Sequence, residues 1–333
     1  MDRSRRRPRL LIALAAGACL AGAAAPPLRA LRWVAPGADG ARILTERPVE
    51  CLPPANSASD RYLIEVGRAA FRTPLVLGGS AARSGIECET CHRNGRTNHD
   101  FHLPGLSGAP GTADVTSFLF SPKRGSGIFN PRPIPDLGGP KAALKVAQTP
   151  GSPALQHFIH GLVTEEFDGA EPPPAVMSGL AAYVRALSPS ACPAAASERV
   201  TLGSDVDNAR RAVRAGLSAL ANHDPATAMV MAGAARTALG DIAERFAAPN
   251  LAADVARLRI ADLDLSAAIA AVRRSDPAAP LALETWLARS NEWATALAVD
   301  EHRSYYDRTI LARALISDHE VTNGIVPGPI SER

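Results

Sequence analysis

The sequence predicts an all-α protein made of two consecutive units. From about Ser197 onward the chain is rich in Ala, Leu and Arg, and its apolar residues recur with the spacing of amphipathic helices. Between Cys51 and Cys192 it is instead rich in Gly, Pro and His. Because domains usually hold roughly 100–200 residues, a chain of 333 residues fits two of them. Pro189 and Cys192-Pro193 mark the joint between the units.

The first unit, residues 51–192, is predicted to hold helices around one long loop. A first helix begins at a capping Asp60 and runs to about Phe71, another covers Ser152 to Thr164, and a last one follows Pro172-Pro173-Pro174. Gly and Pro interrupt residues 99–140 throughout. A loop of that length in a compact domain is normally functional or wrapped around a ligand.

The second unit, residues 197–322, is predicted to be an antiparallel helical bundle. Its breaks are short, so successive helices are expected to lie side by side. No fixed-period repeat is present, which argues against a solenoid, and residues 323–333 are expected to form a flexible tail. The expected helices cover about 204–221, 225–247, 250–274, 280–298 and 301–317.

Residues 1–25 have the layout of a secretory signal peptide. Five Arg precede an apolar run that begins at Leu10 and ends in small residues, which predicts export to the periplasm. The alternatives are a retained membrane tether and lipidation of Cys19. Removal of this segment takes the formal net charge from +3 to about −1. No basic stripe remains, so nucleic acid is not an expected partner.

The run Cys88-Glu89-Thr90-Cys91-His92 is the C-x-x-C-H motif that attaches a c-type haem. Two thiols in one turn can each form a thioether with a vinyl group of the porphyrin, and the adjacent imidazole then lies under the iron. The sequence thus predicts one covalent haem, held by Cys88 and Cys91, with His92 as the proximal ligand. The alternatives are a redox dithiol, which does not need His92, and half of a zinc site, which needs further ligands.

The remaining cysteines, Cys51 and Cys192, form an even pair in an oxidising compartment. They flank the segment that contains the haem motif, so a disulfide between them would join its two ends. Two unpaired thiols are the alternative.

Several runs resemble the haem domains of bacterial di-haem cytochrome c peroxidases and their relatives. Gly67-Arg68-Ala69-Ala70-Phe71 with Pro74-Leu75 precedes Gly85-Ile86-Glu87 and the haem motif, and residues 179–187 look like the last helix of those domains. The resemblance covers roughly residues 58–190. It implies a class I cytochrome c-like fold with long Gly/Pro-rich loops, in which the first and last helices cross and Gly67 or Ala70 meets Tyr183.

Those peroxidases carry two C-x-x-C-H motifs, whereas this chain has one. The peroxidase activity therefore does not transfer with the resemblance. What transfers is haem attachment by Cys88 and Cys91 and ligation by His92.

The function expected of the haem depends on the sixth ligand of its iron. An iron with two protein ligands transfers electrons, whereas an open sixth position can bind peroxide, oxygen or carbon monoxide. Met177 is the first candidate, although its place near the start of the last helix is also typical of a core residue. His99 and His102 follow the haem motif, and His157 and His160 share a helix face. The other possibility is an open or water-bound site.

Near the haem edge, Arg93 and Arg96 are candidates for contacts with the propionates, and solvated arginines are the alternative. A porphyrin bound at the motif also requires a void lined by apolar residues of the long loop.

These observations favour an electron-transfer cytochrome that docks transiently with a redox partner. The alternative is a haem peroxidase-like oxidoreductase with an open distal site, so enzyme activity stays undecided. A third reading makes the helical unit a partner-binding platform with the haem as its redox sensor.

Overall fold

The computed structural model describes residues 27–149, 151–191 and 197–322, and this part of the chain is mostly helical. The expected signal peptide, residues 1–25 with Cys19, the expected tail at 323–333 and Cys192 lie outside the described residues. No helix in the described ranges is long and apolar enough to cross a bilayer.

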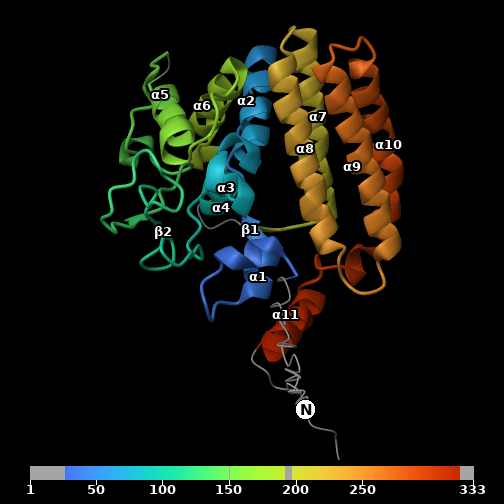
Figure 1. Ribbon diagram of the computed structural model, residues 1–333, viewed down its shortest axis with the longest axis horizontal. Coiled ribbons are helices and arrows are strands. Elements are labelled where there is room, and N and C mark those ends of the chain that lie inside the picture. Colours follow the sequence, from blue (N-terminus) through green and yellow to red (C-terminus); the bar gives the residue numbers. More distant parts are fainter. Residues whose placement is uncertain (1–26, 150, 192–196, 323–333) are drawn as a thin grey trace, which may run out of the picture.

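The first part of the chain alternates short helices with irregular loops (Figure 1). Its elements are η1 (Arg29–Trp33), α1 (Gly40–Thr45), β1 (Glu46–Pro48), α2 (Ala58–Phe71), η2 (Pro74–Val76), α3 (Gly79–Ser84), α4 (Cys88–Cys91), η3 (Arg93–Gly95), β2 (Thr112–Ala113), β3 (Arg132–Pro133), η4 (Lys141–Ala143), α5 (Ala154–Gly161), the π-helical turn η5 (Leu162–Glu166), α6 (Pro174–Ala186) and η6 (Pro189–Ala191).

The predicted helices of this part exist, with different starting points. Helix α2 begins three residues earlier than a cap at Asp60 implies, because the Ser57 hydroxyl is the cap and accepts the Asp60 N–H at 3.0 Å. Helix α5 begins at Ala154, and the helical run then continues past Thr164 through η5. The loop at 99–140 is mostly irregular, apart from the short β2–β3 pair.

Helices α2 and α6 cross in close contact, as the resemblance implies. The residue that meets Gly67 is Gly179, since a Cβ at Gly67 would lie 1.9 Å from the Gly179 carbonyl oxygen. The expected contact of Gly67 with Tyr183 is therefore wrong, and the alternative contact of Ala70 with Tyr183 stays a prediction. Tyr183 lies one turn further along α6 and packs edge-on against Phe71, with 5.2 Å between ring centroids. Two glycines at the crossing let the backbones approach more closely than a glycine–aromatic pair would.

The second part contains four long helices that pack side by side, which we call the four-helix array (Figure 1). Each helix packs against the next in the chain, and α10 returns to α7. The elements are β4 (Ser197–Arg199), α7 (Leu202–Ala221), α8 (Pro225–Arg245), α9 (Ala252–Arg273) and α10 (Ala279–Asp300), followed by η7 (Glu301–Arg303) and α11 (Arg308–Thr322).

The last helix, expected at 301–317, begins only at Arg308. The chain first turns at Ser304 to Tyr306, where Tyr306 is buried and its hydroxyl donates to Asp205 at 2.8 Å. Asp307 then accepts the backbone N–H groups of Thr309 and Ile310, which begins α11 outside the four-helix array. Helix α11 packs instead on α1.

Residues 29–48, to which the sequence analysis assigns no element, join the two parts. Strand β1 pairs antiparallel with β4. Arg29 pairs with Asp241 of α8 at 2.7 Å, and Arg245 of α8 donates to the Leu44 carbonyl at 2.7 Å. Helix α2 also packs on α7 and α8, so the two parts form one continuous structure.

Candidate haem-attachment site

Helix α4 presents the two thiols of the motif from a single turn. Its capping box pairs Glu87 with Thr90, whose hydroxyl accepts the Glu87 N–H at 3.1 Å. Cys88 and Cys91 are three residues apart, so they share one face, and both are free and half-buried. Burial raises the pKa of each thiol to about 12, which keeps both protonated at neutral pH.

His92 ends this helix with its ring held in one orientation. Its Nδ1 lies 3.0 Å from the Pro135 carbonyl oxygen, and because a carbonyl can only accept, Nδ1 carries the proton. Burial lowers the pKa of His92 to about 4, against smaller opposing effects of Pro135 and Asp136. The ring is therefore neutral at pH 7, and its Nε2 carries a lone pair that can bind a metal.

The Pro135 carbonyl is fixed by contacts between its own segment and the residues after the motif. Arg96 Nε binds both carboxylate oxygens of Asp136, at 2.8 and 2.9 Å. The Thr97 hydroxyl donates to the Ile134 carbonyl at 3.0 Å. Partners on both sides of Pro135 thus hold the carbonyl that orients His92.

Both candidate propionate contacts already have partners within the protein. Arg96 pairs with Asp136, and Arg93 Nη2 donates to the Glu46 carbonyl at 2.7 Å. Burial lowers the pKa of Arg93 to about 10, so it remains a cation at neutral pH. Neither side chain is a freely solvated arginine, and a role toward propionates stays a prediction.

A buried ionic network contacts the residues that follow the motif. Glu50 binds Arg68 and Arg72, each at 2.8 Å, and accepts the Tyr183 hydroxyl at 2.8 Å. Arg72 also donates to the Asn94 side chain at 2.7 Å, two residues after His92. This network connects α2, α6 and the end of the haem motif.

The sequence analysis did not identify this network. Asn94 had a signal, because it adopts φ 50° before Gly95 and an Asn-Gly pair is a typical turn sequence. No local sequence pattern connects Glu50 with Arg72 and Tyr183. These two residues lie 22 and 133 residues from Glu50 along the chain, and they meet it only through tertiary packing.

The candidate sixth ligands are scattered over the molecule. Met177 is buried in the hydrophobic core at 3% exposure, as expected for a packing residue. His160 is paired with Glu171 at 2.7 Å, and His157 is exposed. His99 is exposed, and His102 is half-buried.

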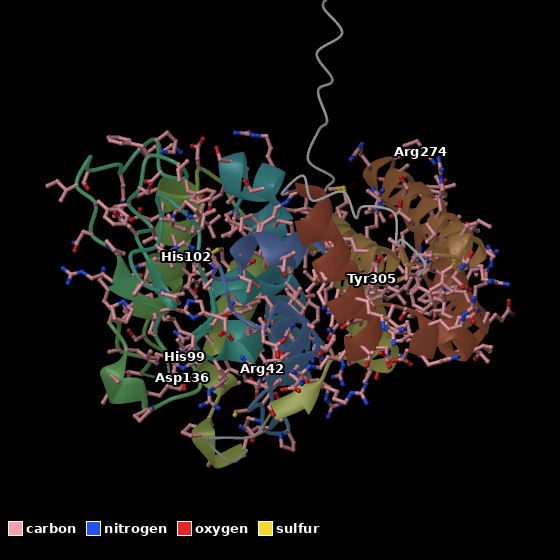
Figure 2. All side chains as sticks on the ribbon, turned by 90° about the horizontal axis from the view of Figure 1, so that it is seen from below. Arg42, His99, His102, Asp136, Arg274 and Tyr305 are labelled. Carbon is pink, nitrogen blue, oxygen red and sulfur yellow. The ribbon has the colours of Figure 1, made fainter. Side chains whose placement is uncertain are left out.

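The two loop histidines occupy different surroundings, so they do not form one site. In Figure 2, His99 lies beside Asp136, and both line a shallow polar depression of about 290 Å³. The backbone N–H of His102 donates to the Trp33 carbonyl at 2.8 Å, which places it against η1. The identity of the sixth ligand therefore stays a prediction.

A second cavity, of about 220 Å³, lies between α4 and helices α7 and α8. Its wall mixes charged side chains, such as Arg29 and Asp241, with apolar ones, such as Leu28. Neither cavity is lined by Cys88, Cys91 or His92, so neither is the apolar void that a porphyrin at the motif requires. Four apolar residues of the long loop are exposed instead, namely Phe118, Leu119, Ile128 and Phe129.

Only one cysteine of the predicted disulfide, Cys51, lies within the described residues. Cys51 is fully buried and takes part in a disulfide. Its carbonyl accepts the Ser188 N–H at 2.8 Å, which brings the chain just after α6 next to Cys51. Cys192 lies outside the described residues, so its pairing with Cys51 stays a prediction.

Within the described ranges, no three or more His, Cys, Asp or Glu side chains are grouped to bind a metal ion. The site thus consists of two free thiols and one oriented, neutral imidazole. No protein-family model matches this sequence, and searches of curated proteins and of solved structures return no significant match.

Proposed function

We propose that the chain is an exported c-type cytochrome with one covalently attached haem, which passes electrons to or from a redox partner in the periplasm. The observation that carries the proposal is the hydrogen bond from His92 Nδ1 to the Pro135 carbonyl. Metal-ligating histidines almost always donate their other N–H to such a partner, which fixes the ring and makes the ligand more basic. A redox dithiol has no use for an oriented imidazole beside it.

The other residues of the site fit the same role. Cys88 and Cys91 are free thiols on one face, so each sulfur can bond to a vinyl carbon while its hydrogen passes to the neighbouring carbon. When bound, the haem supplies an iron that takes up and releases one electron. His92 would hold that iron through Nε2. The Glu50 network keeps the end of the motif in place, which limits rearrangement between oxidation states.

In this proposal residues 51–192 form a class I cytochrome c-like domain, and residues 197–322 form a helical bundle attached to it. The crossing of α2 and α6 at Gly67 and Gly179 supports the first assignment. The packing of the four-helix array supports the second. Export by residues 1–25 brings the chain to the compartment where c-type haem is attached and where the disulfide at Cys51 is stable.

Covalent attachment gives the first prediction. The protein produced in the periplasm of cells that mature c-type cytochromes should keep its haem in acid-acetone and in denaturing gels stained for haem. Cys88→Ser/Cys91→Ser should lose all covalent haem, because no thiol then remains to form a thioether.

The matched control is Cys51→Ser/Cys192→Ser, which removes the same number of cysteines and leaves the motif intact. It should retain covalent haem at a lower thermal stability. Extraction of haem from the wild-type protein by acid-acetone would contradict the proposed function.

The second prediction concerns the axial ligands. With protein ligands on both sides of the iron, the reduced protein should show a low-spin spectrum and bind carbon monoxide slowly. His92→Gly should keep covalent haem through Cys88 and Cys91 but lose the low-spin spectrum, and added imidazole should restore it. Alanine substitution of Met177, His99, His102, His157 and His160, one at a time, then identifies the sixth ligand.

Fast binding of carbon monoxide by the wild-type protein would show an open site. That result would favour the peroxidase-like alternative over electron transfer.

A further inference from the structure

Two of the arginines that line the cavity between α4 and helices α7 and α8 have no carboxylate partner. Seven arginines line this cavity. Five of them form an ion pair with a carboxylate, as Arg29 does with Asp241 at 2.7 Å. The other two, Arg93 and Arg245, form no ion pair with any carboxylate of the described residues, and their hydrogen bonds go to backbone carbonyls.

Both of these guanidinium groups keep N–H donors that no described residue accepts. Arg93 donates to the Glu46 carbonyl at 2.7 Å, and Arg245 donates to the carbonyls of Leu44 and Tyr305 at 2.7 and 3.1 Å. The other guanidinium nitrogens, Nε and Nη1 of Arg93 and Nε of Arg245, all keep some accessible surface. A ligand with acceptor oxygens can therefore reach them.

The lining acids do not balance these two cations. Glu87 is the one lining acid that forms no ion pair within the described residues, and its side chain accepts the Thr90 backbone N–H in the capping box. Burial, with Asp241 and Glu89 nearby, raises the pKa of Glu87 well above 4.5, which favours its uncharged form. The unpaired charge at the cavity wall is therefore positive, and a buried cation is stabilised by an anion beside it.

The remainder of the wall is apolar and begins beside one of the two cations. Leu44, whose carbonyl binds Arg245, lines the cavity together with Ile43 and Trp33. The cavity volume of about 220 Å³ exceeds the roughly 150 Å³ of an engineered protein cavity that holds benzene. The cavity can thus take an organic anion whose apolar body is about as large as a benzene ring.

The cavity adjoins the polar depression that contains His99. Arg93 and Asn98 line both of them, so one wall of the cavity lies next to this depression of the surface. A small ligand has a short path to Arg93 from that side.

We propose that this cavity binds a small monocarboxylic acid in its anionic form. Arg93 and Arg245 hold the carboxylate through charge-assisted hydrogen bonds, and Ile43, Leu44 and Trp33 contact the apolar body. The site lies where the first part of the chain meets the four-helix array, and the haem motif does not line it. The inference therefore does not depend on the haem.

Calorimetric titration of the full-length protein with benzoate tests the proposal. In a buffer free of other carboxylates and of phosphate, one benzoate should bind per chain, with a dissociation constant of about 1 mM or lower. Benzamide has nearly the same shape without the charge, so it should bind at least about tenfold more weakly. Inorganic phosphate has the charge without an apolar body, and it should also bind at least about tenfold more weakly.

Substitutions locate the binding site. Arg93→Gln and Arg245→Gln should each weaken benzoate binding at least about tenfold, because glutamine keeps a donor for the backbone carbonyl but loses the charge. The matched control is Arg274→Gln, which should leave the affinity unchanged. The Arg274 side chain, labelled in Figure 2, is 66% exposed and lies outside the cavity wall.

A second kind of variant tests the volume of the cavity. Ala234 of α8 lines the cavity and is buried, so Ala234→Leu should fill part of it and abolish binding with both arginines in place. Circular dichroism checks that each variant is folded. If a glutamine variant is unfolded, Ala234→Leu decides the question.

Several results would overturn the proposal. They are no binding of benzoate by the wild type, equal affinity for benzamide or phosphate, and unchanged affinity in folded Arg93→Gln, Arg245→Gln or Ala234→Leu. Binding by the haem-free Cys88→Ser/Cys91→Ser variant alone would also overturn it, because a propionate would then occupy Arg93. If the chain carries no haem at all, the expected affinities stay the same, so this test is separate from that of the proposed function.

Discussion

Replacing Gly67 with Ala should lower the free energy of unfolding by about 3 kcal/mol or more. The added Cβ would lie 1.9 Å from the carbonyl oxygen of Gly179 and 2.2 Å from its carbonyl carbon. Both obstacles are backbone atoms, so no side-chain rotation relieves the overlap. The two helices must separate, and the packing of Phe71 against Tyr183 beside the crossing is then disturbed as well.

Urea unfolding followed by circular dichroism measures this effect. Gly240→Ala is the matched control, because Gly240 lies within α8 and an added Cβ there meets nothing within 4 Å. Alanine favours a helix over glycine, so the control should be neutral or stabilising by up to about 1 kcal/mol. Equal stability of the Gly67 variant and the wild type would show that α2 and α6 do not cross as described.

Replacing Glu50 with Ala should cost about 3–5 kcal/mol, the second large effect. Glu50 is the shared partner of Arg68 and Arg72, whose side chains are only 14% and 12% exposed. Its removal leaves Arg68 without this ion pair and leaves Arg72 with only the more distant Glu89 carboxylate, at 3.5 Å. Arg72 also binds Asn94, so the end of the haem motif should loosen too.

The pH dependence of this effect tests its electrostatic origin. Burial by itself raises the pKa of Glu50, but Arg72 and Arg68 outweigh it and hold the pKa far below the ordinary 4.5. The stabilisation is therefore fully present above about pH 5 and is lost progressively as the pH falls toward the folded-state pKa. The free energies of unfolding of the wild type and of Glu50→Gln should differ most near pH 7 and become equal in acid. A difference independent of pH would assign the effect to packing.

The long helices could be predicted because their signal is local. Helices α7 to α10 lie within a few residues of the expected ranges. Their apolar spacing and the breaks near Pro225 and Pro277 can both be recognised within short stretches of sequence. The start of α11 could not, because burial of Tyr306 against Asp205 of a distant helix redirects the chain there. Residues 29–48 also lacked a signal, as their short elements depend on contacts with α8 and β4.

The candidate site divides in the same way. The motif itself gives Cys88, Cys91 and His92, because the proposed haem attachment and iron ligation need neighbouring residues. The partner of His92 is Pro135, 43 residues away, and no local pattern connects the two. Arg96 illustrates the same difficulty, since no local pattern indicates its ion pair with Asp136, while its role toward a propionate stays a prediction.

Strand β1 has a consequence for how the molecule unfolds. It pairs with β4, which leads into the four-helix array, and its Glu46 carbonyl accepts a hydrogen bond from Arg93, which follows the candidate site. Helix α2 also packs on α7 and α8, so neither part can lose its structure without exposing surface of the other. The two parts should therefore unfold together as one cooperative unit.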